Sequence, residues 1–133
     1  MDNYEIDLWG PHAMKGTEEQ KVINELKPTD NDYIIPKRTY SAFDGTGLDR
    51  ALKGLYSEKG SDTVIIAGLH TNICDRHTTY DAFTRGLKIV ISEDGVESFT
   101  EQEHLLGLEY IKKIYGADIK KIKEIIDLFK RIE

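Results

Sequence analysis

The chain of 133 residues is long enough for one domain with a hydrophobic core, and too short for two. Its apolar fraction of 39% is typical of a globular protein, and its net charge of −6 argues against a surface for nucleic acid or anionic membranes. No apolar run is long enough to span a bilayer. A single cysteine excludes an internal disulfide, and no signal segment is present, so we expect a reduced, cytoplasmic protein.

The first forty residues are predicted to contain little regular structure. Residues 9–12 are expected to form an ordered loop, because their proline disfavours strand and helix alike. A helix is predicted from Thr17 to the proline at position 28, since Thr17 and Gln20 match a capping box. The apolar segment 33–37 is typical of a short strand.

Residues 38–45 form a loop that exceeds the usual strand-to-helix connection of about 2–6 residues, and long loops at such places are commonly functional. Thr46 is then expected to cap a helix that ends at Gly60. One apolar face of this helix is predicted to contain Leu48, Leu52, Leu55 and Tyr56.

The segment around Cys74 is predicted to begin as a strand and end as a helix. Thr63–Gly68 is continuously apolar, as in a parallel strand covered on both faces, and the helix after the turn is expected to run to Arg85. A helix N-terminus offers free backbone N–H groups and a partial positive charge, which favour a thiolate. Although a lone cysteine is commonly a small buried side chain, this position makes Cys74 a candidate nucleophile.

The rest of the chain continues the alternation of strand and helix. Residues 88–92 are predicted to be a strand, and 93–95 a turn at its end. Thr100 and Glu103 form a second capping box, which opens a helix to about residue 115. A last amphipathic helix is expected to contain Ile119, Ile122, Ile126, Phe129 and Ile132, with its basic residues on a solvated face.

This alternation predicts an α/β fold of three αβα layers around a parallel, Rossmann-like sheet, with residues 1–133 as a single domain. In such sheets ligands bind at the carboxyl ends of the strands. Lys37, the turn 68–74 and Asp94 all follow predicted strands. The sequence therefore predicts that these three places lie on one rim of the sheet.

The chain resembles the isochorismatase-like cysteine hydrolases, which include nicotinamidases and N-carbamoylsarcosine amidases. Several spaced motifs carry the resemblance in the same order along nearly the whole chain. They are Trp9-Gly10-Pro11-His12-Ala13 with Gly16-Thr17, Lys37 with Tyr40-Ser41-Ala42-Phe43, Gly45-Thr46 with Leu48, Gly68 with Thr71-Asn72-Ile73-Cys74, and Thr78 with Asp81-Ala82 and Gly86.

The resemblance implies a catalytic triad of cysteine, lysine and aspartate, in which Cys74 and Lys37 match the first two members. It implies that Cys74 attacks an amide-like carbon, that a thioester forms, and that Lys37 favours the thiolate. It places the backbone N–H groups of His70 and Cys74 in an oxyanion hole, and a cis peptide bond between Leu69 and His70.

The triad aspartate and the first metal ligands of the family lie in a first strand and second strand that precede the matched region. The aspartate is therefore unassigned here, and among the metal-ligand positions only His12 is matched. The thiol chemistry requires no cofactor, while the resemblance leaves room for a divalent metal such as zinc at His12. Without the first strand we expect exposed strand edges, and hence self-association as a homo-oligomer.

These observations predict a cysteine-dependent hydrolase of a small amide or carbamoyl compound, with Trp9, Tyr40 and Phe43 as walls of a pocket for a flat substrate unless they belong to the core. The alternative is a non-catalytic member that acts as a structural or interaction module. Hydrolysis of a vinyl ether, as in isochorismatases, is disfavoured by Cys74, and a redox role by the lack of a second cysteine.

His77 is expected in the core or near the site, and His104 at the surface.

Overall fold

The computed structural model describes residues 4–54 and 60–132, and these contain one parallel sheet with strand order β1-β2-β3. Its strands are β1 (Thr63–Leu69), β2 (Lys88–Glu97) and β3 (Asp118–Lys120). The helices are α1 (Tyr4–Trp9), α2 (Leu48–Gly54), α3 (Arg76–Thr84), α4 (Glu101–Tyr115) and α5 (Ile122–Lys130).

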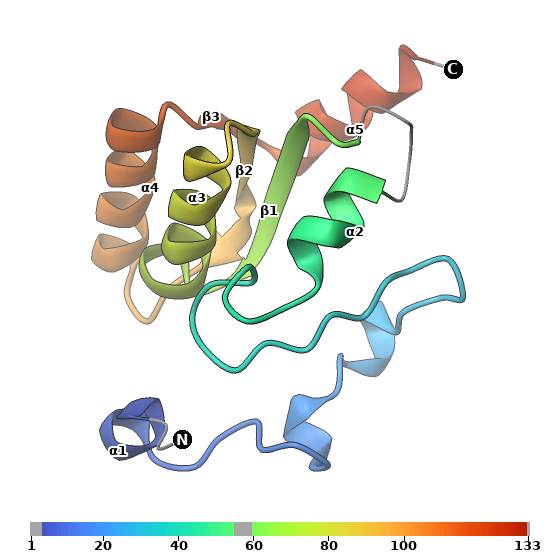
Figure 1. Cartoon of the computed structure of the whole chain (residues 1–133). Coiled ribbons are helices and arrows are strands. Elements are labelled where there is room, and N and C mark those ends of the chain that lie inside the picture. The colour runs from blue at the N-terminus through green and yellow to red at the C-terminus, as the bar shows by residue number, and fades with distance from the viewer. Residues whose placement is uncertain (1–3, 55–59, 133) are drawn as a thin grey trace.

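Helices cover both sides of the sheet, which confirms the predicted α/β class (Figure 1). The crossover helices α3 and α4 lie side by side on one face, while α2 and α5 lie on the other. Right-handed crossovers between successive neighbouring strands place their helices on the same face, as observed. The core is built mainly on β2, from Ile89, Ile91 and Val96, together with Ile66 of β1 and Ile111 of α4.

Local signals predicted the second half of the chain well. The hydroxyl of Thr100 accepts the backbone N–H of Glu103 at 3.2 Å, which confirms Thr100 as the N-cap of α4, and the same hydroxyl contacts the Glu103 carboxylate at 2.9 Å. Gly86 and Gly116 follow α3 and α4 with φ of +71° and +67°, the left-handed conformation that ends a helix. Thr46 accepts the N–H of Leu48 at the start of α2, and the expected continuation through Leu55 and Tyr56 lies outside the described residues.

The helix predicted after Thr17 is not formed. Two short 3₁₀ turns, Glu18–Gln20 and Asn24–Leu26, replace it, and the hydroxyl of Thr17 donates to the Met14 carbonyl at 2.7 Å instead of capping. An amphipathic helix gains most of its stability by burying its apolar face, and here Ile23 and Leu26 are 60% and 71% exposed. The one helix of this region is α1, in a segment predicted to be irregular.

The strand predicted over residues 33–37 is also wrong, because this segment is extended but pairs with no strand among the described residues. For the same reason β1 is an edge strand. Among the residues described, it pairs only with β2. Ile65, predicted to be covered, is 44% exposed, and Leu69 at the end of the strand is 60% exposed. Self-association through this surface stays a prediction.

Two boundaries near the sheet differ from expectation. The strand predicted over residues 88–92 continues as β2 to Glu97, and its pairing with β1 shifts between Ile66 and Gly68. Asp94 therefore lies within β2, where its carboxylate accepts the N–H of Ile122 at 2.7 Å and so holds the start of α5. Ile119, expected in the last helix, belongs to β3. In the described ranges no helix is long and apolar enough to cross a membrane.

Candidate functional site

Cys74 lies in the connection between β1 and α3, at the carboxyl end of the sheet. The expected cis peptide bond between Leu69 and His70 is present, and a single π turn, Thr71–Asp75, follows it. The N–H groups of Ile73 and Asp75 donate to the His70 carbonyl at 3.0 and 3.1 Å. Cys74 thus lies in the π turn that runs directly into α3, close to the predicted start of the helix.

Lys37 reaches Cys74 from a segment that precedes α2. Its Nζ lies 3.5 Å from the Cys74 Sγ and donates to the Thr39 carbonyl at 2.8 Å. The structure therefore brings together the two residues that the sequence singled out, although the segment carrying Lys37 is not the predicted strand. An ammonium group at this distance can donate a hydrogen bond to the sulfur.

Asp75 adds a carboxylate to the same turn, one that the sequence analysis did not single out. It is 5% exposed, and its Oδ2 has no hydrogen-bond partner among the described residues. Burial raises the pKa of Asp75 from 3.8 to about 6, and the positive charge of Lys37 offsets part of that effect. A buried carboxylate without a partner is unusual, and it is the most strongly perturbed acid near the thiol.

Aromatic rings form a wall beside the turn. The ring of Phe99 stacks on His70 at 4.1 Å and on Trp9 at 5.9 Å, both with interplanar angles of 25°. The Trp9 indole N–H donates to the Tyr40 hydroxyl at 3.1 Å, and Tyr40 lies 5.3 Å from the ring of His77. Two predicted pocket residues, Trp9 and Tyr40, are therefore in contact, and Phe99 joins them.

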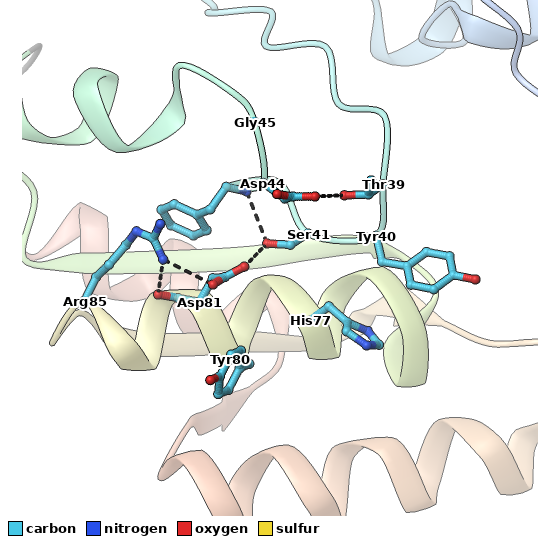
Figure 2. Close-up of a pocket in the computed structure, with 10 residues that line it drawn as sticks. Thr39, Tyr40, Ser41, Asp44, Gly45, His77, Tyr80, Asp81 and Arg85 are labelled. Atoms are coloured by element: carbon cyan, nitrogen blue, oxygen red, sulfur yellow. Dashed lines mark hydrogen bonds and ion pairs between the residues drawn. The ribbon is translucent and has the colours of Figure 1, made fainter. Parts of the chain in front are cut away.

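Phe43, the third predicted pocket residue, is 5% exposed and belongs to the hydrophobic core. It also borders a surface hollow of about 500 Å³, which Figure 2 shows between the 39–45 loop and α3. The residues lining this hollow include Tyr40, His77, Asp81 and Arg85, but neither Cys74 nor Lys37. The hollow thus lies beside the thiol site instead of containing it.

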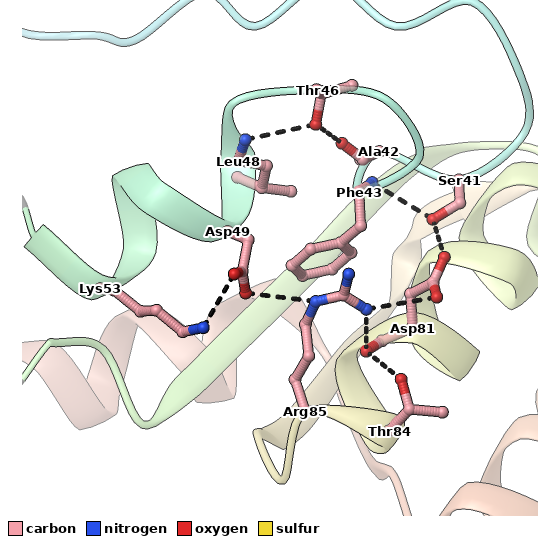
Figure 3. A network of polar contacts seen from close by, with 10 residues as sticks. All are labelled: Ser41, Ala42, Phe43, Thr46, Leu48, Asp49, Lys53, Asp81, Thr84 and Arg85. Carbon is pink, nitrogen blue, oxygen red and sulfur yellow. Dashed lines mark hydrogen bonds and ion pairs between the residues drawn. The ribbon is translucent and has the colours of Figure 1, made fainter.

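A polar network fixes the 39–45 loop on α3 (Figure 3). The Ser41 hydroxyl donates to the Asp81 carboxylate at 2.5 Å and accepts the Phe43 N–H at 3.2 Å. Arg85 donates to Asp81 and to Asp49 of α2, both at 3.2 Å, with its guanidinium 4.4 Å from the Phe43 ring. Since Lys37 lies directly before this loop, the network limits where its side chain can reach.

His12 has close partners in this structure. Its Nδ1–H donates to the Gly10 carbonyl at 2.7 Å, and its Nε2 lies 3.4 Å from the Glu5 carboxylate. The hydrogen bond to Gly10, with Glu5 nearby, raises the pKa of His12. Residues 4–54 and 60–132 hold no cluster of three or more side chains of the ligating types. We therefore derive no step through a metal.

The outlying histidines also have defined partners. His77 is exposed, and its Nδ1–H donates to the Ile73 carbonyl at 2.6 Å, one turn earlier. His104, predicted at the surface, is half-buried, with its Nδ1 2.8 Å from the hydroxyl of Thr71. The pattern of α4 alone could have placed His104 on the face that packs against the π turn. It could not have identified Thr71 as the partner of His104.

Comparison with known proteins places the chain in one family. The model of the isochorismatase domain matches residues 2–122. The uncharacterized isochorismatase family protein PncA of Bacillus subtilis (strain 168) is 34% identical over 122 residues, which cover 86% of this chain and 64% of that protein. Enterobactin synthase component B of Escherichia coli (strain K12) is 36% identical over 105 residues, covering 79% of this chain and 35% of that protein.

Solved structures give the same result. The N-carbamoylsarcosine amidase from Thermoplasma acidophilum superposes with a TM-score of 0.80 at 39% identity, covering 90% of this chain and 65% of that one. An isochorismatase-like hydrolase from Alkaliphilus metalliredigens gives 0.85 at 35% identity, covering 94% and 65%. This chain spans between about one third and two thirds of the length of these relatives. It belongs to the isochorismatase-like hydrolase family.

Proposed function

We propose that this chain is a cysteine-dependent hydrolase of a small amide or carbamoyl compound. The observation that carries the proposal is the 3.5 Å contact between the Lys37 Nζ and the Cys74 Sγ at the carboxyl end of the sheet. The names of two related structures, an N-carbamoylsarcosine amidase and a nicotinamidase from Bacillus subtilis, support substrates of this class.

In the proposed reaction the Cys74 thiolate attacks the carbonyl carbon, and a carbon–sulfur bond forms while the carbonyl electrons move to oxygen. The backbone N–H groups of His70 and Cys74 bind that oxygen. The carbon–nitrogen bond then breaks, and the proton released from the thiol leaves with the amine. Water hydrolyses the resulting thioester and regenerates Cys74. The wall of Trp9, Phe99 and Tyr40 suits a flat substrate.

A second candidate is a non-catalytic structural or interaction module. It is favoured by the lack of an assigned carboxylate for the catalytic triad among the residues that match the family. This alternative predicts an ordinary thiol, because a module that only binds has no need of an activated nucleophile.

The test compares the rate of Cys74 alkylation by iodoacetamide at pH 7 in the wild type and in Lys37→Ala. An ammonium 3.5 Å from the sulfur contributes about 1 kcal/mol even with the dielectric of water, so we expect alkylation to slow roughly fivefold. Lys27→Ala, which removes another exposed lysine, is the matched control and leaves the rate unchanged.

Hydrolysis is measured as ammonia release from nicotinamide and from N-carbamoylsarcosine, with Cys74→Ser as the inactive control. Release that depends on both Cys74 and Lys37 supports the proposal. Equal alkylation rates in the wild type and Lys37→Ala, together with no ammonia from either compound, favour the module instead.

A further inference from the structure

The first two residues of the π turn are held from outside by α4 and the segment before it. The hydroxyl of Thr71 is 2.8 Å from the Nδ1 of His104, and the Thr71 side chain is fully buried. The carbonyl oxygen of the Asn72 side chain accepts a hydrogen bond from the Ser98 hydroxyl. These side chains come from a region that lies between 26 and 33 residues further along the chain.

Gly107 brings the backbone of α4 against the same two residues. A Cβ on Gly107 would lie 3.1 Å from the Thr71 methyl group and 3.2 Å from both the Cβ and the backbone N of Asn72. Contacts this short are tighter than nearly all real Cβ contacts, so the close approach favours glycine at this position. With its side chains tied and its backbone packed, the start of the turn has little freedom to move.

The turn carries the two N–H groups that the proposed reaction needs. His70 precedes Thr71 directly, and Cys74 lies three residues after it. The inner hydrogen bonds, from Ile73 and Asp75 to the His70 carbonyl, fix the shape of the turn. The outer contacts to His104 and Ser98 fix its position relative to the sheet and α4. Oxyanion donors act by being held in place before the charge develops.

We propose that His104 is a positioning residue, which acts through Thr71 to hold the backbone N–H groups of His70 and Cys74 where the oxyanion forms. This inference rests on the proposed function. His104 contacts the buried Thr71 hydroxyl, not the thiol, so its removal should affect oxyanion binding more than the reactivity of Cys74.

Two probes of Cys74 separate these effects. Iodoacetamide forms a carbon–sulfur bond and releases iodide without placing charge on oxygen. Pyridine-3-carbaldehyde adds reversibly to the thiolate, so that a carbon–sulfur bond forms and the carbonyl electrons move to an oxygen in the oxyanion position. The dissociation constant of the aldehyde therefore reports the N–H donors, while the alkylation rate reports the thiol alone.

We expect His104→Leu to weaken aldehyde binding at least tenfold while changing the alkylation rate less than twofold. His104→Asn keeps a polar atom at the same number of bonds from the backbone as Nδ1, and should restore affinity to within about threefold of the wild type. Gln102→Leu, an exposed position on α4, is the matched control and should bind the aldehyde as the wild type does. If His104→Leu does not fold, the pair Thr71→Ser and Thr71→Val gives the same comparison.

Three results overturn the inference. His104→Leu with wild-type affinity for the aldehyde shows that the contact does not position the donors. Equal losses of aldehyde binding and alkylation show a general loss of structure. A His104→Asn variant that binds the aldehyde no better than His104→Leu shows that the polar contact with Thr71 is not what holds the donors. If the wild-type protein itself alkylates slowly and binds no aldehyde, the proposed function is refuted. This outcome is seen without any substitution, so it is distinct from a failure of the inference about His104.

Discussion

Replacing the buried carboxylate Asp75 with asparagine tests whether the interior beneath the Cys74 turn is as dry as the structure indicates. Asp75 is 5% exposed, with one oxygen unpartnered among the described residues. Burial raises its pKa from 3.8 to about 6, and Lys37 offsets part of this effect. Charging this group therefore costs folding free energy, and asparagine at the same position cannot be charged.

The pH dependence follows from the sign of the shift. Because the pKa of Asp75 is higher in the folded state, its favourable contribution is complete below about pH 4 and is lost as the pH rises through about 6. The difference between 3.8 and about 6 corresponds to about 3 kcal/mol. Between pH 4 and pH 7 the wild type should thus lose about 2.5 kcal/mol of this relative to Asp75→Asn, on the order of 10 °C in Tm.

Thermal unfolding of both proteins at several pH values between 4 and 7.5 measures this difference, and the other carboxylates cancel because both proteins share them. Asp30→Asn, at an exposed position, is the matched control and should follow the wild type at every pH. Parallel Tm curves for the wild type and Asp75→Asn would show that water or a cation reaches Asp75, and would refute the reasoning.

Two further substitutions test the surroundings of the site. Asp81→Asn removes the charge that binds Ser41 and Arg85, so we expect a loss of about 1–2 kcal/mol and faster proteolysis in the 39–45 loop; unchanged proteolysis would show that the network does not hold the loop. Phe99→Ala removes the ring between Trp9 and His70, so the fluorescence of Trp9, the only tryptophan, should shift to longer wavelength with less than about 1.5 kcal/mol lost; an unshifted spectrum would contradict the stacking.

Sequence-based prediction succeeded where a structure depends on residues close together in the sequence, and failed where it depends on packing between distant residues. The ends of α3 and α4 were predicted because capping side chains and glycines act within a few residues, and the structure confirms Thr100, Gly86 and Gly116 in these roles. The helix after Thr17 carried the same kind of signal and did not form. Its apolar residues have no surface to pack on among the described residues, and a capping box alone stabilises a helix too little.

The site shows the same division. Cys74 was a candidate because its place after an apolar strand is visible in the sequence, and Lys37 because it matched a motif of the family. Their contact joins residues 37 positions apart, and no local pattern predicts it. Asp75 and Phe99 were missed because an aspartate in a helix or a phenylalanine in a loop is unremarkable until its burial or its stacking partner is known.

The two halves of the proposed site, the turn with Cys74 and the segment with Lys37, differ in how firmly they are held. The turn with Cys74 is fixed by the sheet, by its own hydrogen bonds and by α4. Lys37 ends the segment 4–37, which holds α1 and two 3₁₀ turns and whose side chains are mostly exposed. Its contacts with the rest of the chain include those of Trp9 with Tyr40 and Phe99 and that of Lys37 with Cys74. A long, mostly exposed segment opens more readily than a packed turn. The charge beside the thiol therefore depends on the docking of this segment. Substitutions that loosen residues 4–37 should change the alkylation rate of Cys74 more than they change the position of the N–H donors that aldehyde binding reports.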